Sequence, residues 1–444
     1  MLKIVFSACW LFLPLALIAN DFPQFRGSNG IGVAESTEIP LSWSMTDHVA
    51  WKIEVSGAGW SQPVLIGEKL YLTTAVSEKN LKPKDFSDGV KMPQSMGLGG
   101  LTRAPNTLIQ WQVHCYDAKT GERLWVETIS EGKPKYPVHP SNTYATESPV
   151  ADANGVYAFF GATGTVAGLS HQGQILWRQE LGAFSTSNGF GTGSSMAIHN
   201  GKVFVQHFTA GSGILACFDT KTGDQLWRSD RKKNESSWSS PIIWQNNMRI
   251  ELLSSGNDLI CSYDPETGRE LWRLGNVKSP TACSIAADNR QIYFGGSDPF
   301  STGPLFAMQA GASGDISPKK KNESFDTCRW VEAKGGPGMP SPVSTGAYVY
   351  VVDKNILKCY DAESGNRLYQ NRLPSAPMVA ASPIVIGDKL LLIDEAGNST
   401  LIKVGSEFEV VGGGKLDDIF WSTPAVGNGT IYFRGVNALY CVRK

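Results

Sequence analysis

The sequence lacks an excess of charge of either sign and lacks long blocks of like charge. Its 444 residues include 40 lysines and arginines against 41 aspartates and glutamates, which gives a formal net charge of −1. Proteins that hold nucleic acid or an anionic membrane through surface charge usually carry a basic excess. We therefore expect neither nucleic acid nor an anionic membrane as a partner.

Convincing helical runs are also missing after the first 20 residues, whereas residues that form turns are abundant. The chain has 47 glycines and 24 prolines beside 13 tryptophans. This composition is typical of many short strands joined by tight turns. The sequence therefore predicts an all-β fold.

Motifs for bound metals and haem are absent as well. None of the cysteines forms a Cys-x-x-Cys or Cys-x-x-Cys-His motif, and the 6 histidines include no pair with the spacing of metal ligands. Zinc sites and covalent haem attachment depend on such spacings. We predict no metal site.

The one long apolar run stands at the start of the chain. Residues 1–20 combine one lysine, an apolar stretch and a small residue at Ala19, which is the layout of a secretory signal peptide. We expect cleavage near Ala19-Asn20 and a periplasmic or secreted monomer with no transmembrane segment. The alternative is a retained anchor helix, which Pro14 and the shortness of the run disfavour.

A recurring Ser-x-Pro element organises the rest of the chain. Its last residue defines an anchor position in each of eight units: Pro63, Pro149, Met196, Pro241, Ile285, Pro342, Pro383 and Pro424. The spacings between successive anchors are 86, 47, 45, 44, 57, 41 and 41 residues. A four-stranded propeller blade takes about 40–45 residues. Eight residues after the anchor, seven of the eight units have a residue suited to a second strand, and Arg249 is the exception.

The second half of each unit is a hairpin followed by an aromatic residue. DAKTGERLW at residues 117–125 recurs in related form at 219–227, 264–272 and 361–369, and a shorter version occupies 171–177. In this motif the Asp carboxylate can accept backbone N–H bonds in the turn, and the Gly supplies a positive φ. The aromatic residue then lies on the returning strand.

These units predict an eight-bladed β-propeller of four-stranded antiparallel blades, formed as one domain by residues 48–444 after an extension at 21–47. Only three strands follow the last anchor, and the strand-like segment at 48–56 has no partner strands before it. We therefore expect this N-terminal strand to join the C-terminal blade and close the ring, which removes an open edge. Two insertions, at about 77–106 and 315–326, are predicted to be polar loops.

Four cysteines occupy the same strand position in four different blades: Cys115, Cys217, Cys359 and Cys441. Equivalent positions are spread around a ring, so most pairs should exceed the roughly 4.4–6.8 Å between Cα atoms that a disulfide needs. We predict small buried thiols at these positions.

The repeats resemble the tryptophan-docking repeats of the pyrroloquinoline quinone (PQQ) propeller superfamily. FPQFRG at 22–27, GWSQP at 59–63 and NTYATESPV at 142–150 further resemble exported bacterial PQQ-binding-like repeat proteins. The superfamily includes quinoprotein alcohol dehydrogenases and, without a cofactor, the propeller subunit of the outer-membrane β-barrel assembly machinery. The resemblance implies the propeller fold and is weak for activity.

In the enzymes of that superfamily, the resemblance implies a quinone held between a tryptophan and a disulfide of adjacent cysteines, with a metal bound by Glu, Asn and Asp. This sequence contains no adjacent cysteines. We therefore expect no cofactor, and PQQ with calcium is the alternative.

Residues just ahead of each first strand should lie near the central channel. There the sequence places the Trp-Ser-x-Pro segments that begin at Trp60, Trp238 and Trp421, together with Ser61. Trp60 and Trp421 belong to neighbouring blades and could flank a flat ligand. The other interpretation is that the hydroxyls bond to neighbouring strand ends and the indoles cover the core.

The richest polar cluster precedes the second blade and contains His139, Asn142, Tyr144 and Glu147. His139, Tyr144 and Glu147 are candidates for acid–base catalysis, and Asn142 and Glu147 are candidates for ligand binding. A loop whose polar groups satisfy one another is the other interpretation.

Four further charged residues are candidates for binding an anionic group or a cation. Arg26 and Arg103 could reach an anionic group, although surface or salt-bridged positions are more typical of arginine. Asp417 and Asp418 could offer oxygen ligands, although adjacent acids at a turn are usually solvated.

Together these features favour an exported binding or scaffold protein without redox activity. Its partner would be a protein or a small sugar-like or peptide-like ligand on the face that carries the first insertion. The alternative is an enzyme that uses the channel mouth, either a PQQ-dependent oxidoreductase or a carbohydrate-active enzyme.

Overall fold

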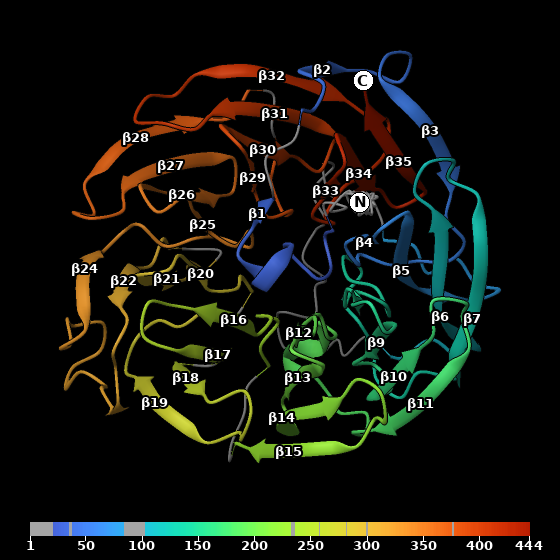
Figure 1. The fold of residues 1–444 in the computed structure, drawn as a ribbon, viewed down its shortest axis with the longest axis horizontal. Helices are drawn as coiled ribbons and strands as arrows, with labels where there is room; N and C mark the ends of the chain where they lie inside the picture. Colours follow the sequence, from blue (N-terminus) through green and yellow to red (C-terminus); the bar gives the residue numbers. More distant parts are fainter. Residues whose placement is uncertain are drawn as a thin grey trace, which may run out of the picture.

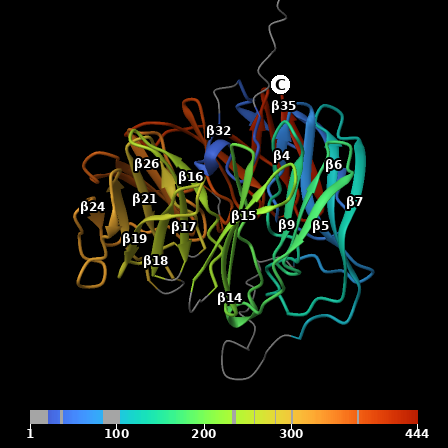
Figure 2. The ribbon, with the colours of Figure 1, turned by 60° about the horizontal axis from the view of Figure 1, so that its bottom comes forward.

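The computed structural model is a ring of eight β-sheets, which Figure 1 shows along the ring axis and Figure 2 shows turned toward the side. It describes residues 21–34, 38–83, 103–231, 236–256, 258–280, 282–298, 301–374 and 377–444. Within these ranges the only helical elements are two short 3-10 turns, η1 (Ser28–Gly30) and η3 (Ser187–Gly189). The predicted eight-bladed all-β fold is confirmed, whereas the predicted signal peptide lies outside the described residues.

In the described ranges, no helix is long and apolar enough to cross a bilayer.

Each of the first seven blades takes its four main strands in chain order, from the innermost strand outward. They are β4 (Val64–Ile66), β5 (Lys69–Val76), β6 (Ile109–Asp117) and β7 (Arg123–Gly132) in blade one; β8 (Val150–Ala151), β9 (Val156–Phe160), β10 (Thr165–Leu169) and β11 (Ile175–Glu180) in blade two; β12 (Ala197–His199), β13 (Lys202–Thr209), β14 (Ser212–Asp219) and β15 (Gln225–Asp230) in blade three; β16 (Ile242–Gln245), β17 (Ile250–Gly256), β18 (Leu259–Tyr263) and β19 (Glu270–Gly275) in blade four; β20 (Ala286–Ala287), β21 (Gln291–Gly295), β22 (Leu305–Gln309) and β24 (Cys328–Glu332) in blade five; β25 (Val343–Ser344), β26 (Tyr348–Asp353), β27 (Ile356–Asp361) and β28 (Arg367–Arg372) in blade six; and β29 (Ile384–Ile386), β30 (Lys389–Ile393), β31 (Asn398–Lys403) and β32 (Val410–Lys415) in blade seven.

Blade eight combines the two ends of the described chain. Its inner strands are β33 (Ala425–Gly427), β34 (Thr430–Arg434) and β35 (Ala438–Arg443), and its outer strand is β3 (Val49–Glu54). β3 pairs antiparallel with β35, from Val49 opposite Val442 to Glu54 opposite Ala438. β3 thus gives blade eight the four strands that the other blades have.

The inner hairpins share one register. In seven blades the residue after the anchor pairs with the residue eight positions after the anchor, as Val64 does with Tyr71 and Val150 with Tyr157. Blade four differs because its hairpin is longer: Gln245 pairs with Ile250, so Arg249 lies in the turn. The exception that the sequence indicated at Arg249 is therefore a longer turn.

The repeated hairpin motif works as its chemistry predicts. In blade three the Asp219 carboxylate accepts the backbone N–H groups of Lys221 and Thr222 at 2.8 and 2.9 Å. Gly223 follows with a φ of 73°. A Cβ atom there would lie 2.5 Å from the indole of Trp177, so the tryptophan of blade two packs directly on the glycine of blade three.

The same docking recurs around the ring. The Trp177 Nε1 group donates to the Thr220 carbonyl at 2.8 Å, across the gap between the two blades. Four more tryptophans pack on the turn glycine of the next blade: Trp51 on Gly121, Trp125 on Gly173, Trp227 on Gly268 and Trp330 on Gly365. Neighbouring blades are therefore held together at their outer strands by buried aromatic surface.

A second set of contacts joins the blades at the channel. The backbone N–H just before each anchor donates to the side-chain hydroxyl at the same position of the next blade, over 2.8–3.0 Å. The links run from Gln62 to Ser148, Ser195, Ser240, Ser284, Ser341, Ser382 and Thr423. Blades eight and one are bridged one residue earlier, where the Ser422 hydroxyl donates to the Ser61 carbonyl at 3.1 Å. The hydroxyls of this serine ring thus bond to neighbouring strand ends.

Replacing Ser284 by alanine should remove one link of the serine ring. The Ser240 N–H, which donates to the Ser284 hydroxyl at 2.9 Å, would lose its partner at a buried site. We expect the free energy of unfolding to fall by about 1–3 kcal/mol, measured by urea unfolding. Ser284→Thr is the control, since Thr423 serves the same position in blade eight; an equal loss in both variants would contradict a role for the hydroxyl.

The N-terminal segment lies across the channel, and Figure 1 shows β1 (Val33–Ala34) in the middle of the ring. Phe22 exchanges two backbone hydrogen bonds with Leu65 of blade one, at 2.8 and 3.0 Å. The Pro23 carbonyl accepts the N–H of Ala151 in blade two, and the Gln24 side chain accepts the N–H of Ile198 in blade three. β1 then pairs in parallel with β29 of blade seven. We call residues 22–34 the axial segment.

Arg26 is the centre of the axial segment, and the expectation of a surface or salt-bridged arginine was wrong. Its side chain is 0% exposed, and its guanidinium donates to the carbonyls of Ile31, Ile285 and Pro342. Two of these carbonyls belong to blades five and six. Burial lowers the pKa of Arg26 to about 9. The position follows from backbone carbonyls that converge on the axis and need a donor with several N–H groups.

Blade one receives the axial segment through Gln62. Its side-chain oxygen accepts the N–H of Arg26 at 2.9 Å, and its amide group donates to the Gln24 carbonyl at 3.1 Å. The other blades carry a hydroxyl residue at this position. The substitution of Gln for that hydroxyl therefore ties the N-terminal extension to the ring.

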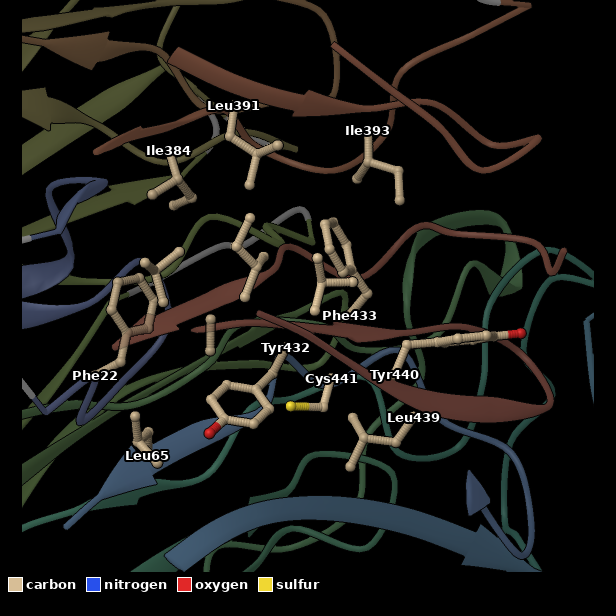
Figure 3. Close-up of a cluster of buried hydrophobic side chains, with 14 of the residues drawn as sticks. Phe22, Leu65, Ile384, Leu391, Ile393, Tyr432, Phe433, Leu439, Tyr440 and Cys441 are labelled. Carbon is tan, nitrogen blue, oxygen red and sulfur yellow. The ribbon is translucent and has the colours of Figure 1, made fainter. Parts of the chain in front are cut away.

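The largest hydrophobic cluster lies between the first and last blades. Phe22 and Leu65 pack there with side chains of blades seven and eight, among them Ile384 and Tyr432 (Figure 3). Cys441 is buried in the same cluster, and no disulfide joins the seven cysteines in the described ranges. Buried thiols at the four repeated positions agree with the prediction.

The structure describes the second insertion but only the flanks of the first. The first falls largely outside the described residues, which stop at Pro83 and resume at Arg103. The second begins with β23 (Gly314–Asp315), which pairs in parallel with β19 of the preceding blade. Asn322 then accepts the N–H of Lys278 at 2.7 Å. The second insertion is thus packed on blade four, because its backbone completes the outer edge of that blade.

Candidate functional site

The predicted polar cluster borders a pocket at the channel mouth. The pocket has a volume of about 180 Å³ and is lined by Leu81, Lys82, Arg103, Pro105, Val138, His139, Pro140, Asn142 and Tyr144. It lies between the two flanks of the first insertion and the loop that leads into blade two. Three of the candidate residues, His139, Asn142 and Tyr144, are therefore brought together, and we call this cavity the mouth pocket.

His139 has a defined protonation state in this loop. The backbone N–H of Ser141 can only donate, and it lies 3.1 Å from His139 Nδ1. Nδ1 is therefore the acceptor, the Ser141 hydroxyl also donates to it at 2.6 Å, and the neutral ring carries its proton on Nε2. Nε2 is buried and has no hydrogen-bond partner. Burial also lowers the pKa of His139, which keeps the ring neutral.

Asn142 uses all of its hydrogen-bonding capacity within the protein. Its amide N–H groups donate to the carbonyls of Phe190 and Thr192 at 2.7 and 3.0 Å. Its oxygen accepts the Thr143 N–H and the Thr146 hydroxyl. The side chain therefore joins the lead-in loops of blades two and three and offers no free polar atom to a ligand.

Tyr144 lies at the base of the same loop. Its side chain is 4% exposed, and its hydroxyl donates to the Tyr136 carbonyl at 3.1 Å. Its own carbonyl accepts the Trp111 indole N–H at 2.9 Å. Tyr144 thus forms one wall of the pocket with its ring, and its hydroxyl holds the loop.

Glu147 does not line the mouth pocket. Its side chain is 1% exposed, and neither carboxyl oxygen makes a hydrogen bond of normal geometry. Burial raises the pKa of Glu147 to about 7, although the nearby Thr192 hydroxyl offsets part of that rise. A Cβ atom on Gly161 would lie 2.7 Å from the Glu147 carboxyl, so the glycine provides the space that this carboxyl occupies.

The other fully buried glutamate shows how unusual that environment is. Glu251 accepts hydrogen bonds from Arg249, Asn246, Trp272 and Ser262. A buried carboxylate normally has such donors, because burial without them costs several kcal/mol. Glu147 lacks them, and the protonated acid is the form that its surroundings favour.

Trp60 and Trp421 are neighbours, as their blades require, but they pack on each other. Their ring centroids are 5.8 Å apart and the rings are inclined by 22°. A flat ligand between them would need about 7 Å, that is, two contacts of about 3.5 Å. Each indole N–H is also bonded, Trp60 to the Ser141 carbonyl at 2.8 Å and Trp421 to Glu395 at 2.6 Å. The two indoles form a stacked pair that covers the core.

Trp238 lies in a separate aromatic group. Its indole N–H donates to the Gly191 carbonyl at 2.7 Å, and its ring meets Phe190 edge to face at 5.8 Å. Phe190 in turn lies 5.1 Å from the His139 ring. Trp238 therefore packs against the lead-in loop of blade three, which in turn contacts the loop of blade two.

Ser61 is completely buried and is held by an arginine that the sequence reasoning missed. Arg434, 1% exposed, donates to the carbonyls of Ser61 and Thr73 at 3.2 and 2.8 Å, and also to the Ser61 hydroxyl. Burial lowers the pKa of Arg434 to about 9. The side chain ties blade eight to blade one, and no repeat position marks it in the sequence.

The paired acids also have a structural role. Asp418 accepts the backbone N–H groups of Asn437 and Ala438 at 2.9 and 3.0 Å, which fixes the turn between β34 and β35, whereas Asp417 is exposed. Asp418 is half-buried, so the turn uses a partly solvated acid as its acceptor. No group of three or more His, Cys, Asp or Glu side chains in the described ranges is placed to hold a metal ion.

Comparisons with known proteins bear on both the repeats and the ring. A family described as outer membrane protein assembly factor BamB matches residues 162–314. Among solved structures, BamB from Moraxella catarrhalis aligns with a TM-score of 0.57 at 12% identity, over 89% of this chain and 97% of that one. The quinohemoprotein alcohol dehydrogenase ADHIIG from Pseudomonas putida HK5 aligns with a TM-score of 0.59 at 9% identity, over 96% of this chain and 80% of that one. The chain is a β-propeller in which residues 162–314 match a PQQ-like repeat family.

At these identities the solved structures establish the fold alone. No curated protein matches this chain in sequence. The family model covers part of the ring, from the middle of blade two to the start of the second insertion. What the PQQ-like propeller does must therefore be inferred from its own residues.

The residues of this PQQ-like propeller do not fit a quinone held as the resemblance implies. The neighbouring indoles of Trp60 and Trp421 stack on each other, and adjacent cysteines are absent from the sequence. Glu147 has no second carboxylate or Asn side chain as a partner in the described ranges. We derive no chemical step through such a cofactor.

The mouth pocket also contains residues that the sequence reasoning did not select. Lys82 lies in the first insertion, where no repeat allows comparison, and its ammonium donates to the Asn437 side chain of blade eight at 3.0 Å. Arg103, which the sequence analysis considered as a group that could reach an anion, is exposed and lines this pocket. In the sequence, the lysines that cluster in the first insertion were the one indication of this cationic lining.

Proposed function

We propose that this PQQ-like propeller is an exported binding or scaffold protein whose ligand occupies the mouth pocket. It would act as one propeller domain from residue 48 to residue 444, after an extension at 21–47 and a signal peptide at 1–20. The observation that carries the proposal is the pocket of about 180 Å³ that combines the flanks of the first insertion with His139 and Tyr144. A concave site with few polar groups is the usual form of a small-ligand site.

Two further observations support this location. The axial segment bonds to the inner strands of blades one, two, three and seven, so it covers the channel at the anchors and just beyond them. The mouth pocket lies at residues that precede the anchors. The relative described as an assembly factor suggests a protein partner, and the pocket is of a size for one side chain or sugar of that partner.

The second candidate is an enzyme that uses His139, Tyr144 and Glu147. The raised pKa of Glu147, about 7, favours it, because a general acid is most effective near the working pH. Against it stand the Tyr144 hydroxyl, which is engaged with the Tyr136 carbonyl, and Glu147, which lies outside the pocket lining. Glu147→Gln should abolish any turnover of the enzyme and leave ligand binding unchanged in the binding protein.

Filling the pocket tests the proposed function. Leu81→Trp places a larger side chain in the pocket lining, and Leu124→Trp makes the same change on β7, where Leu124 is 45% exposed. A ligand-observed NMR screen of small sugars, sugar acids and short peptides should find compounds whose binding is lost in Leu81→Trp and kept in Leu124→Trp. If every bound compound ignores Leu81→Trp, the mouth pocket is not the site.

A further inference from the structure

Among the described side chains that line the mouth pocket, the polar atoms left free to a ligand are all donors. Asn142 is fully bonded within the protein, and the Tyr144 hydroxyl donates to a carbonyl. His139 adds no free donor, because Ser141 occupies its Nδ1 and its Nε2–H is buried. Arg103 and Lys82 supply cationic donors, and none of the described residues that line the pocket is acidic. A ligand that complements this set must supply acceptors.

The charge of the pocket is positive and unneutralised within the described ranges. None of the ion pairs found there includes Arg103 or Lys82. Lys82 is bonded to the neutral Asn437 side chain, which leaves its charge unbalanced while using one of its donors. A guanidinium presents two parallel N–H groups that match a carboxylate.

We propose that the mouth pocket binds the carboxylate of a small ligand, with Arg103 and Lys82 supplying the charge and the hydrogen-bond donors. This rests on the proposed function, since it names the ligand class of the same site. The cavity of about 180 Å³ limits the bound part to the size of one sugar or one to two amino-acid residues. One exposed arginine and a partly engaged lysine suit a single negative charge better than a dianion.

Two ligand sources share this chemistry, a sugar acid and a peptide C-terminus. Isothermal titration of the full chain would compare D-glucuronate with D-glucose, and acetyl-Gly-Gly with its C-terminal amide. We expect the acid of at least one pair to bind at least tenfold more tightly than its neutral counterpart, with an affinity that falls as salt rises. The pair that discriminates identifies the source.

Substitutions in the pocket sharpen the comparison. Arg103→Gln and Lys82→Gln should each weaken the acid several-fold without changing its neutral counterpart. Lys319→Gln, in the second insertion and outside the pocket lining, is the matched control and should change neither.

The outcomes separate this inference from the proposed function. If acid and neutral members bind equally and Leu81→Trp abolishes both, the carboxylate inference fails while the mouth pocket remains the site. If the acids bind but ignore Arg103→Gln, Lys82→Gln and Leu81→Trp, the carboxylate is held elsewhere and both claims fail. If no acid binds in either pair, the carboxylate inference is overturned, and the wider screen alone decides the proposed function.

Discussion

Phe22→Ala is expected to lower the free energy of unfolding by about 3–5 kcal/mol, the cost typical of removing a fully buried phenylalanine. The Phe22 ring is 1% exposed and packs with Leu65 in the cluster between the first and last blades. It also rests on Gly27, where a Cβ atom would come within 2.6 Å of the ring. Urea unfolding followed by tryptophan fluorescence measures the loss.

The same segment provides a matched control. Phe25 lies three residues later and is only partly buried. Because hydrophobic stabilisation scales with the area removed from water, Phe25→Ala should cost clearly less than Phe22→Ala. Equal losses of stability in the two variants would mean that the buried position of Phe22 is not what stabilises the protein. No loss in Phe22→Ala would mean that the axial segment does not hold the ring together.

Glu147→Gln is expected to change how stability depends on pH. The pKa of Glu147 is about 7 in the fold against 4.5 for an ordinary glutamate. Below pH 4.5 the group is protonated in both states and costs nothing. Between pH 4.5 and 7 it ionises in the unfolded state first, so the wild-type protein should lose about 3 kcal/mol of stability over this range.

The glutamine variant has no such loss, because its side chain does not titrate. The difference in unfolding free energy between Glu147→Gln and wild type should therefore grow by about 3 kcal/mol from pH 4.5 to pH 8. Burial lowers the pKa of His114 to about 3 and that of His207 to about 4, but these groups titrate in both proteins and cancel in the difference. Parallel pH profiles for the two proteins would show that Glu147 is ionised and paired in the fold.

The sequence predicted the ring because the ring is periodic. Every blade repeats the anchor and most add a docking aromatic residue, and these residues act on their own or the next blade. Trp177 reaches Thr220 in the adjacent unit, for example, which the spacing of the repeats already implies. Comparing the copies was therefore enough to assign the fold and to locate the buried thiols.

Contacts that break the period could not be found in this way. Arg26 bonds to carbonyls 259 and 316 residues further along the chain, and it occurs once, so no copy indicates its role. Arg434 is likewise single. The sequence contains no signal for which blade faces the axial segment, so Arg26 was expected at the surface and Arg434 was not selected at all.

The candidate site was predicted in part. His139 and Tyr144 were selected because they stand close together in a polar stretch, and proximity in the chain places them in one loop. Glu147 belongs to the same stretch, three residues past Tyr144, but its side chain is buried outside the pocket lining. Whether Trp60 and Trp421 would stack on each other or on a ligand depends on a spacing of 5.8 Å that no sequence pattern encodes.

The most direct test of this account is the dissociation constant of the best-bound carboxylate, measured on Leu81→Trp and on Trp421→Phe. The first variant fills the mouth pocket, and the second alters the stacked indole pair at the channel. We expect Leu81→Trp to weaken binding at least tenfold and Trp421→Phe to change it less than twofold. Binding that survives Leu81→Trp and is lost in Trp421→Phe would place the ligand at the tryptophans and contradict the account.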